Sequence, residues 1–343
     1  MFSFLTPSKA AKALVNDVLI TVQPKETLLQ AALRQGIDFP HSCRVGGCAS
    51  CKCKLVEGRV KELTQTGYIL SDEELDQGYI LACQSVPRGD VRIQVDMAGA
   101  QARRQVAGRV VAQEPLTHDI VRLRVQLDEA LPYKAGQFAQ LRVASLPGVA
   151  RSYSFATPVQ PHAQVSFFVR RVPDGVFSSH VHARSLVGQA VLVDGPHGDF
   201  WLRPAEAPLL LVAGGSGLAP MLAMLEDALA QGVRRPATLL FGARTQADLY
   251  ALDAIESIGA RWGDGFAFVP VLSDEPAHSD WVGQCGFVTQ VIPGHAPASC
   301  HAYLCGPPPM VDAAMALLMQ HGVARAHIHA DRFTTQHDVP VAA

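Results

Sequence analysis

Five of the eight cysteines fall between residues 43 and 83, and their spacing points to a metal cluster. Three of them follow the pattern C-x4-C-x2-C, and 31 residues separate the third from Cys83. Two irons bridged by sulfide need four terminal thiolates, and this pattern is the plant-type [2Fe–2S] spacing. We therefore predict single-electron chemistry, with the ligands Cys43, Cys48, Cys51 and Cys83.

Zinc is the first alternative for this cysteine loop. Zinc knuckles usually come as two C-x2-C pairs, whereas this loop has one C-x2-C preceded by a four-residue gap. His41 suggests a Rieske centre, but such centres replace two cysteines with two histidines, and four cysteines are already present. Cys53, in a strand continuing from Cys51, points to the same side as Cys51, so geometry alone does not exclude it. We interpret Cys53 as a packed or partly exposed thiol and leave it out of the ligand set.

A glycine turn follows the apolar segment 208–213 and opens a predicted helix. Its sequence is Gly214-Gly215-Ser216-Gly217-Leu218-Ala219-Pro220, and glycines at a helix N-terminus cradle phosphate. A dinucleotide-binding Rossmann fingerprint has a third glycine where Pro220 stands, and an acidic residue at the end of the second strand. The second strand here ends in Arg244. The plain Rossmann interpretation therefore fails on both counts.

Two further short patterns could bind a phosphate-bearing cofactor. In Arg151-Ser152-Tyr153-Ser154, the guanidinium suits bidentate phosphate contact, and the tyrosine offers a flat face with a polar tip. An exposed strand arginine is the default alternative for such a short match. In Gly175-Val176-Phe177-Ser178, the serine and the N–H groups of a helix starting there could hold a pyrophosphate. The alternative for this serine is an N-cap, and both roles can coexist.

The elements that must position these residues form three segments. Residues 1–100 alternate short strands with one main helix over 25–37, which indicates a small β-grasp domain. Residues 104–205 read as strand after strand with short turns and one helix near Phe177, which favours a six-stranded antiparallel β-barrel. Residues 206–343 alternate strands with helices, which predicts a parallel α/β sheet. The predicted fold class is thus multidomain, α+β and α/β.

Composition excludes several other functions. The chain has 343 residues, 48% of them apolar and 17% charged, which suits two or three globular domains. A formal net charge of −2 gives no indication of a nucleic-acid partner. No segment approaches the ~20 apolar residues that span a bilayer, and the start carries no secretory signal pattern. We expect a cytoplasmic protein.

Together, these motifs resemble the ferredoxin–NADP reductase superfamily. The family's R-x-Y-S, G-x-x-S and G-G-T/S-G-x-A-P motifs match residues 151–154, 175–178 and 214–220. Its C-G-P-P motif matches Cys305-Gly306-Pro307-Pro308, and its C-terminal aromatic segment matches Ala330-Asp331-Arg332-Phe333. With the N-terminal cluster domain, the order is similar to reductase components of bacterial multicomponent oxygenases. The runs 39–55, 249–256 and 303–314 look especially like the subgroup that serves xylene monooxygenases, and naphthalene dioxygenase reductases come next.

The resemblance implies a role for each matched residue. Arg151 would meet the flavin phosphates, Tyr153 would stack on the isoalloxazine, and Ser154 would hydrogen-bond near N5. Cys305 would lie by the nicotinamide, and Phe333 would lie close to the flavin. Ser154, Cys305 and Phe333 are thus the expected catalytic residues. The expected cofactor-binding set is Arg151, Ser152, Tyr153, Ser154, Gly175, Ser178, Gly214, Gly215, Ser216, Gly217, Pro220, Arg244, Cys305, Gly306 and Pro307.

The residues after the second strand of the last segment bear on the choice of coenzyme. NADPH readers usually place two or more basic or hydroxyl groups there. Arg244 could reach a 2′-phosphate, whereas Asp248 would repel it. We therefore favour NADH over NADPH.

The resemblance implies electron flow from NADH through FAD and the [2Fe–2S] cluster to a terminal oxygenase, of Rieske or diiron type, or to its ferredoxin. The oxygenase would hydroxylate an aromatic or hydrocarbon substrate. One alternative is a reductase with the same domain order that serves a sugar-deoxygenation dehydrase. Another is a non-catalytic iron–sulfur redox sensor, which the intact R-x-Y-S and C-G-P-P motifs argue against.

Overall fold

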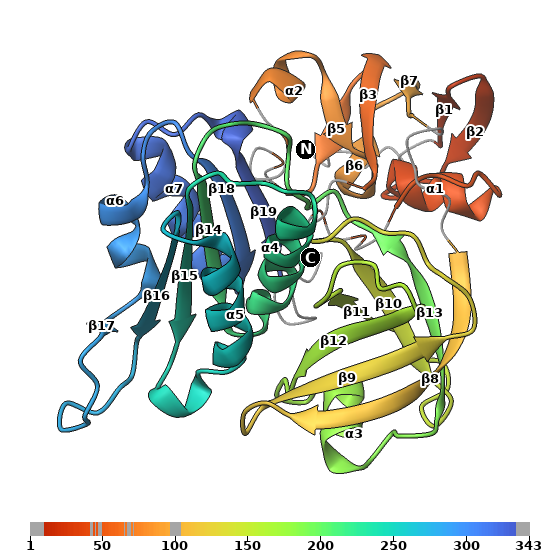
Figure 1. The fold of residues 1–343 in the computed structure, drawn as a ribbon. Helices are drawn as coiled ribbons and strands as arrows, with labels where there is room; N and C mark the ends of the chain where they lie inside the picture. Colours follow the sequence, from red (N-terminus) through yellow and green to blue (C-terminus); the bar gives the residue numbers. More distant parts are fainter. Residues whose placement is uncertain are drawn as a thin grey trace, which may run out of the picture. The chain divides into compact units, whose positions relative to one another are not determined.

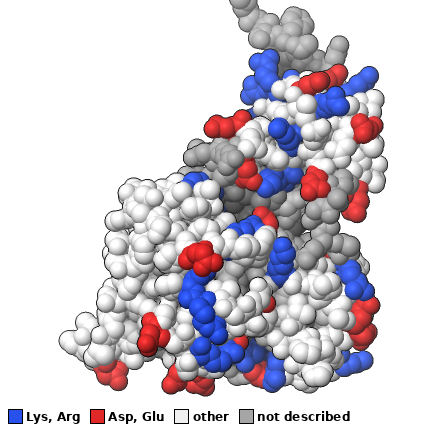
Figure 2. Space-filling view, turned by 45° about the horizontal axis from the view of Figure 1, so that its top comes forward, with Lys and Arg blue, Asp and Glu red and all other residues white. Residues whose placement is uncertain are grey.

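The computed structural model describes residues 10–41, 44, 46, 50–64, 66, 70, 72–96 and 104–333. The chain divides into two compact units, with the boundary between residues 102 and 103. Within the described residues, no helix is long and apolar enough to cross a bilayer. Acidic and basic side chains occur side by side on the face drawn in Figure 2, in keeping with the small net charge.

The first unit is built on a mixed five-stranded sheet with the order β2-β1-β7-β3-β5 (Figure 1). β1 pairs with β7 in parallel, whereas its pairing with β2 is antiparallel. A two-stranded ribbon, β4-β6, accompanies the sheet. The elements are β1 (Ala11–Val15), β2 (Val18–Val22), α1 (Leu28–Arg34), β3 (Lys52–Glu57), β4 (Val60–Glu62), α2 (Asp72–Asp76), β5 (Tyr79–Leu81), η2 (Ala82–Gln84), β6 (Ser85–Pro87) and β7 (Val91–Gln94).

Helix α1 begins and ends where local chemistry places it. The Thr27 hydroxyl accepts from the Gln30 backbone N–H, and the Gln30 side chain accepts from the Thr27 N–H, which makes a capping box. The buried residues of α1 face the sheet and belong to the core of this unit: Leu28, Leu29, Ala31 and Ala32. The predicted β-grasp arrangement is confirmed.

The second unit opens with a six-stranded antiparallel sheet of order β11-β10-β13-β8-β9-β12. A bridge between Phe155 and Phe167 joins its two outer strands, so the sheet closes into the predicted barrel. Alternate residues of these strands point inward and fill the barrel with aliphatic and aromatic side chains. The elements are β8 (Arg104–Pro115), β9 (Ile120–Leu127), β10 (Phe138–Val143), β11 (Arg151–Ser154), β12 (Gln164–Arg170), α3 (Val176–Ala183) and β13 (Ala190–His197).

The same unit continues into a six-stranded sheet of order β17-β16-β15-β14-β18-β19, all of whose pairs are parallel. Both faces are covered, as the predicted α/β arrangement requires. α4 and α5 lie on one face, and α6 and α7 on the other (Figure 1). The elements are β14 (Leu209–Gly214), η3 (Gly215–Gly217), α4 (Leu218–Ala230), β15 (Ala237–Ala243), η4 (Gln246–Asp248), α5 (Leu252–Trp262), β16 (Phe266–Leu272), β17 (Gln284–Cys285), η5 (Val288–Val291), α6 (Ile292–His295), β18 (His301–Gly306), α7 (Pro308–Gln320), η6 (Arg325–His327) and β19 (Ile328–Arg332).

The barrel and the parallel sheet share one hydrophobic core. Ile120 and Phe168 of the barrel belong to the same buried cluster as Leu211 of β14 and Phe241 of β15. This shared core places the barrel beside the carboxyl ends of the parallel strands, where open α/β sheets bind ligands.

Candidate functional site

The first part of the site is the pair of cysteines in the N-terminal unit. Cys51 directly precedes β3, and Cys83 lies in η2; both are buried, at 2% and 4% exposure. The Ala82 N–H donates to the Cys51 carbonyl over 3.0 Å, which brings these two segments together. Cys43 and Cys48, the other two predicted ligands, lie outside the described residues.

The surroundings of Cys83 fit an iron–sulfur ligand. The Gln84 amide nitrogen donates to the Cys83 Sγ over 3.6 Å, and hydrogen bonds to the sulfurs are typical of such clusters. Cys53 is buried on β3, and its burial, reinforced by the nearby Cys83, raises its pKa to about 12. None of the described cysteines is joined in a disulfide.

The second part is the strand β11, whose residues alternate between two environments. Ser154 is buried, and its Oγ has no hydrogen-bond partner among the residues that the structure describes. A buried hydroxyl without a partner is costly, so an unpartnered one marks a place for a ligand atom. Tyr153 points the other way, with its ring 5.5 Å from that of Phe177, and burial raises its pKa. Arg151 shares this second face, and its Nη1 donates to the Ala150 carbonyl.

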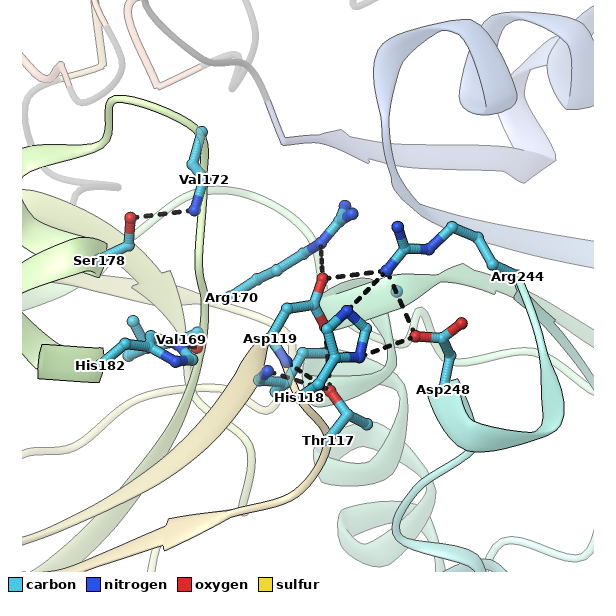
Figure 3. Close-up of polar contacts among 12 residues, drawn as sticks. Thr117, His118, Asp119, Val169, Arg170, Val172, Ser178, His182, Arg244 and Asp248 are labelled. Atoms are coloured by element: carbon cyan, nitrogen blue, oxygen red, sulfur yellow. Dashed lines mark hydrogen bonds and ion pairs between the residues drawn. The ribbon is translucent and has the colours of Figure 1, made fainter. Parts of the chain in front are cut away.

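Helix α3 begins beside this strand, with Gly175 as its N-cap residue. The Ser178 hydroxyl accepts from the Val172 N–H over 3.1 Å and donates to the Gly175 carbonyl over 3.3 Å (Figure 3). Both hydrogen bonds of the Ser178 hydroxyl are therefore made within the segment 172–178 itself. The helix has no side-chain cap at Gly175, so the N–H groups of its first turn are the donors that this end offers.

The third part is the glycine turn after β14, which packs against the end of β18. A Cβ on Gly214 would lie 2.6 Å from the Met310 Sδ, and one on Gly217 would lie 2.6 Å from the Cys305 carbonyl carbon. At Gly217 the contact is with backbone, so this position needs glycine, whereas at Gly214 the Met310 side chain would have to move. The close approach places η3 and the start of α4 against the end of β18, and a glycine turn at a helix N-terminus suits a pyrophosphate.

Cys305 and Phe333 lie at the adjoining strand ends. Cys305 is fully buried at the register position beside Ala213 of β14, and burial, with Asp331 nearby, raises its pKa well above the usual value. The Phe333 N–H donates to the Gly306 carbonyl over 2.9 Å, so the C-terminal aromatic residue lies against the C-G-P-P segment. The structure thus brings together the C-G-P-P motif and the C-terminal aromatic segment, which are two separate motifs in the sequence.

A pocket of about 500 Å³ opens at the carboxyl ends of the parallel strands. Gly214, Gly215, Arg244 and Pro307 line it among the predicted residues. The remaining predicted residues of this segment do not line it: Ser216, Gly217, Pro220, Cys305, Gly306 and Phe333.

Three residues that the sequence did not single out take part in this region. Asp119 and Arg170, from the barrel, line the pocket, and Asp119 accepts from the Arg170 Nε over 3.1 Å. Tyr250 is buried, and its hydroxyl donates to the Gly215 carbonyl over 2.9 Å. Tyr250 falls in the run 249–256 that carried the resemblance, which was the available signal for it. No local pattern marks Asp119 or Arg170.

Three family models match the chain in sequence order. The 2Fe-2S iron-sulfur cluster binding domain matches residues 15–88, and the oxidoreductase FAD-binding domain matches residues 107–201. The oxidoreductase NAD-binding domain matches residues 211–316. The chain is thus an oxidoreductase with sites for a [2Fe–2S] cluster, FAD and NAD.

Curated relatives match along nearly the whole chain. The xylene/toluene monooxygenase electron transfer component of Pseudomonas putida is 42% identical over 311 residues, covering 90% of this chain and 89% of that protein. The reductase component of phenol 2-monooxygenase from Pseudomonas sp. (strain CF600) is 36% identical, covering 93% of each chain. Among solved structures, the Amycolatopsis cytochrome P450 reductase matches with a TM-score of 0.72 and 33% identity, covering 95% of this chain and 99% of that one.

Proposed function

Because the chain belongs to the family of electron-transfer (reductase) components of bacterial multicomponent oxygenases, we propose that it takes electrons from NADH and delivers them one at a time to a terminal oxygenase or to that oxygenase's ferredoxin. The oxygenase hydroxylates an aromatic or other hydrocarbon substrate. When bound, FAD would accept one hydride from NADH, which carries two electrons. The [2Fe–2S] cluster would carry these electrons one at a time. The observation that carries the proposal is the presence of all three cofactor domains in one chain.

In this proposal, Cys43, Cys48, Cys51 and Cys83 hold the cluster. The burial of Cys51 and Cys83 supports this assignment, since it keeps water away from the thiolates. Cys53 stays a neutral packing thiol.

FAD lies along β11 and the start of α3. Arg151 and the N–H groups of α3, which begins after Gly175, hold its phosphates, and Tyr153 packs against its ring. The Ser154 hydroxyl, buried and without a partner among the described residues, would donate to the ring near N5. Ser152 adds a polar contact from the same strand, and Ser178 keeps the α3 loop in shape.

NADH lies in the pocket at the end of the parallel sheet. The backbone N–H groups of the turn over 214–217, at the start of α4, hold its pyrophosphate, and Pro220, which has no N–H, fixes the backbone of the first turn of α4. Cys305, Gly306 and Pro307 shape the nicotinamide side of the site, and Phe333 lies close to the flavin. The raised pKa keeps the Cys305 thiol neutral, so it adds no charge where a hydride moves.

We assign residues 1–100, 104–205 and 206–343 to the ferredoxin, FAD-binding and NAD-binding domains. The family-model matches, each lying inside one of these ranges, support the assignment. We also propose that the protein works in the cytoplasm, where NADH is supplied.

The proposal is tested with the purified holoprotein. We expect NADH to reduce ferricyanide and cytochrome c, and product to form when a terminal oxygenase is added. Reconstitution with a Rieske and with a diiron oxygenase, scored as hydroxylated product per NADH consumed, identifies the acceptor. A protein that oxidises no NADH with any of these acceptors refutes the proposal.

A further inference from the structure

A polar network joins the barrel to the end of β15, the second strand of the parallel sheet. The turn between β8 and β9 carries His118 and Asp119, and both reach Arg244 (Figure 3). The Arg244 Nη2 lies 3.2 Å from the His118 Nε2 and 3.5 Å from the Asp119 Oδ2. It also lies 3.3 Å from the Asp248 Oδ1. One guanidinium nitrogen thus meets three groups from two different domains.

His118 contacts both Arg244 and Asp248. Its Nε2 lies 3.2 Å from the Arg244 Nη2, and its Nδ1 lies 3.4 Å from the Asp248 Oδ1. His118 therefore bridges the guanidinium and the Asp248 carboxylate from the barrel side.

The two carboxylates are held more firmly than the arginine between them. Asp119 also accepts from the Arg170 Nε over 3.1 Å, and the Asp248 Oδ2 accepts from the Thr245 N–H and hydroxyl, both over 3.0 Å. The Asp119 and Asp248 side chains are 15% and 13% exposed, whereas that of Arg244 is 51% exposed. The carboxylates are anchored by other partners, and the guanidinium that they hold is the more exposed group.

This network occupies the place where a dinucleotide site reads the ribose. The end of the second parallel strand, beside the strand that carries the glycine turn, is where an acid accepts the 2′-hydroxyl or an arginine accepts a 2′-phosphate. Asp119, Arg244 and Asp248 all line the pocket there. An arginine that binds phosphate needs its fork of donors free. Here one nitrogen is engaged, and two negative charges lie within 3.5 Å of it.

We infer that His118 and Asp119, on the FAD-binding barrel, act with Asp248 as specificity determinants that hold Arg244 away from the 2′-phosphate of NADPH and so select NADH. The inference rests on the proposed NADH oxidation and adds to it the contribution of the barrel. Coenzyme choice is set across the boundary between two domains, by two residues outside the NAD-binding segment.

The test compares NADPH with NADH as donors for ferricyanide reduction by the holoenzyme. We expect Asp119→Asn and Asp248→Asn each to raise the NADPH:NADH ratio of kcat/KM at least tenfold, a change worth about 1.4 kcal/mol. His118→Ala should raise it about threefold, because it removes one contact of the Arg244 guanidinium and leaves both carboxylates in place. Adding Arg244→Ala to either Asn variant should abolish the rise, since the released guanidinium is what binds the 2′-phosphate.

Matched charge removals provide the control. Asp128→Asn, after β9, and Asp253→Asn, in the first turn of α5, each delete one exposed carboxylate close in sequence to the network, and neither should move the ratio. An unchanged ratio in Asp119→Asn, or a rise that survives Arg244→Ala or appears equally in the controls, overturns the inference. Absence of NADH oxidation by the wild-type holoenzyme would instead refute the proposed function, so the two failures are distinct.

Discussion

Replacing Gly217 with alanine tests how the nucleotide site is assembled. A Cβ at this position would lie 2.6 Å from the Cys305 carbonyl carbon and 3.0 Å from the Gly306 nitrogen. Both atoms are backbone at the centre of the sheet, so no side-chain rotation relieves the contact. The backbone at Gly217 is already helical, with φ −61°, so the penalty comes from contact and not from conformation.

The size of the effect follows from the distances. Ordinary carbon–carbon contact begins near 3.4 Å, so the turn must move away from β18 by roughly 1 Å, and such overpacking costs about 2 kcal/mol. For a unit of this size that is a fall in Tm of about 4–8 °C. Because the turn is also the proposed phosphate cradle, we expect kcat/KM for NADH to fall at least ~10-fold.

The assay pairs this variant with Gly294→Ala. Gly294 lies in α6, and a Cβ there would meet nothing within 4 Å. That control should keep both Tm and kcat/KM near the wild-type values. If Gly217→Ala also matches the wild type in both quantities, the close packing of the turn on the C-G-P-P strand is wrong.

Three further predictions concern single side chains. Cys305→Ala should slow flavin reduction by NADH while leaving FAD content near normal; stopped-flow reduction at the wild-type rate would remove Cys305 from the site. Cys53→Ala should keep the full iron and sulfide content, whereas Cys83→Ala should lose it, and loss of iron from the Cys53 variant would make that thiol a ligand. His329 has its pKa lowered to about 4, chiefly by burial, so between pH 6.5 and 4 the unfolded state binds more protons and stability falls as the pH falls. This loss of unfolding free energy amounts to about 1.4 kcal/mol at pH 5.5. The variant His329→Gln lacks the titrating group, so its fall in Tm between neutral pH and pH 5.5 should be smaller than that of the wild type by about 3–5 °C. Parallel profiles of Tm against pH for the two proteins would contradict the assignment.

The domain order and the sheet types were predictable because each rests on local periodicity. The alternating pattern of a barrel strand such as β10 indicates that one face of the strand is buried. The continuous apolar run of β14 indicates that both faces are buried. The 3-10 helix η2, which carries Cys83, instead separates β5 from β6. The Ser85 hydroxyl donates to the Leu81 carbonyl across that interruption, and the Ala82 N–H turns to Cys51. These contacts depend on the folded partner segment, so no local pattern reports them.

The motif residues of the site were also predictable, but their long-range partners were not. Arg244 and Asp248 are four residues apart and visible together, whereas Asp119 is 125 residues from Arg244 in the chain. Asp119 looks like an ordinary turn residue in the sequence, because Thr117 and Asp119 make the local bonds typical of such turns. Only the packing of barrel on sheet shows that it also faces the pocket.

Anaerobic titration of the holoprotein with NADH, followed by visible absorbance and EPR together, tests the central claim most directly. The account predicts that NADH bleaches the flavin and that the EPR signal of a reduced [2Fe–2S] cluster appears, with both changes absent from protein stripped of FAD. A flavin that is reduced while the cluster stays oxidised, or a cluster that NADH reduces without FAD, would contradict the electron path from NADH through FAD to the four cysteines.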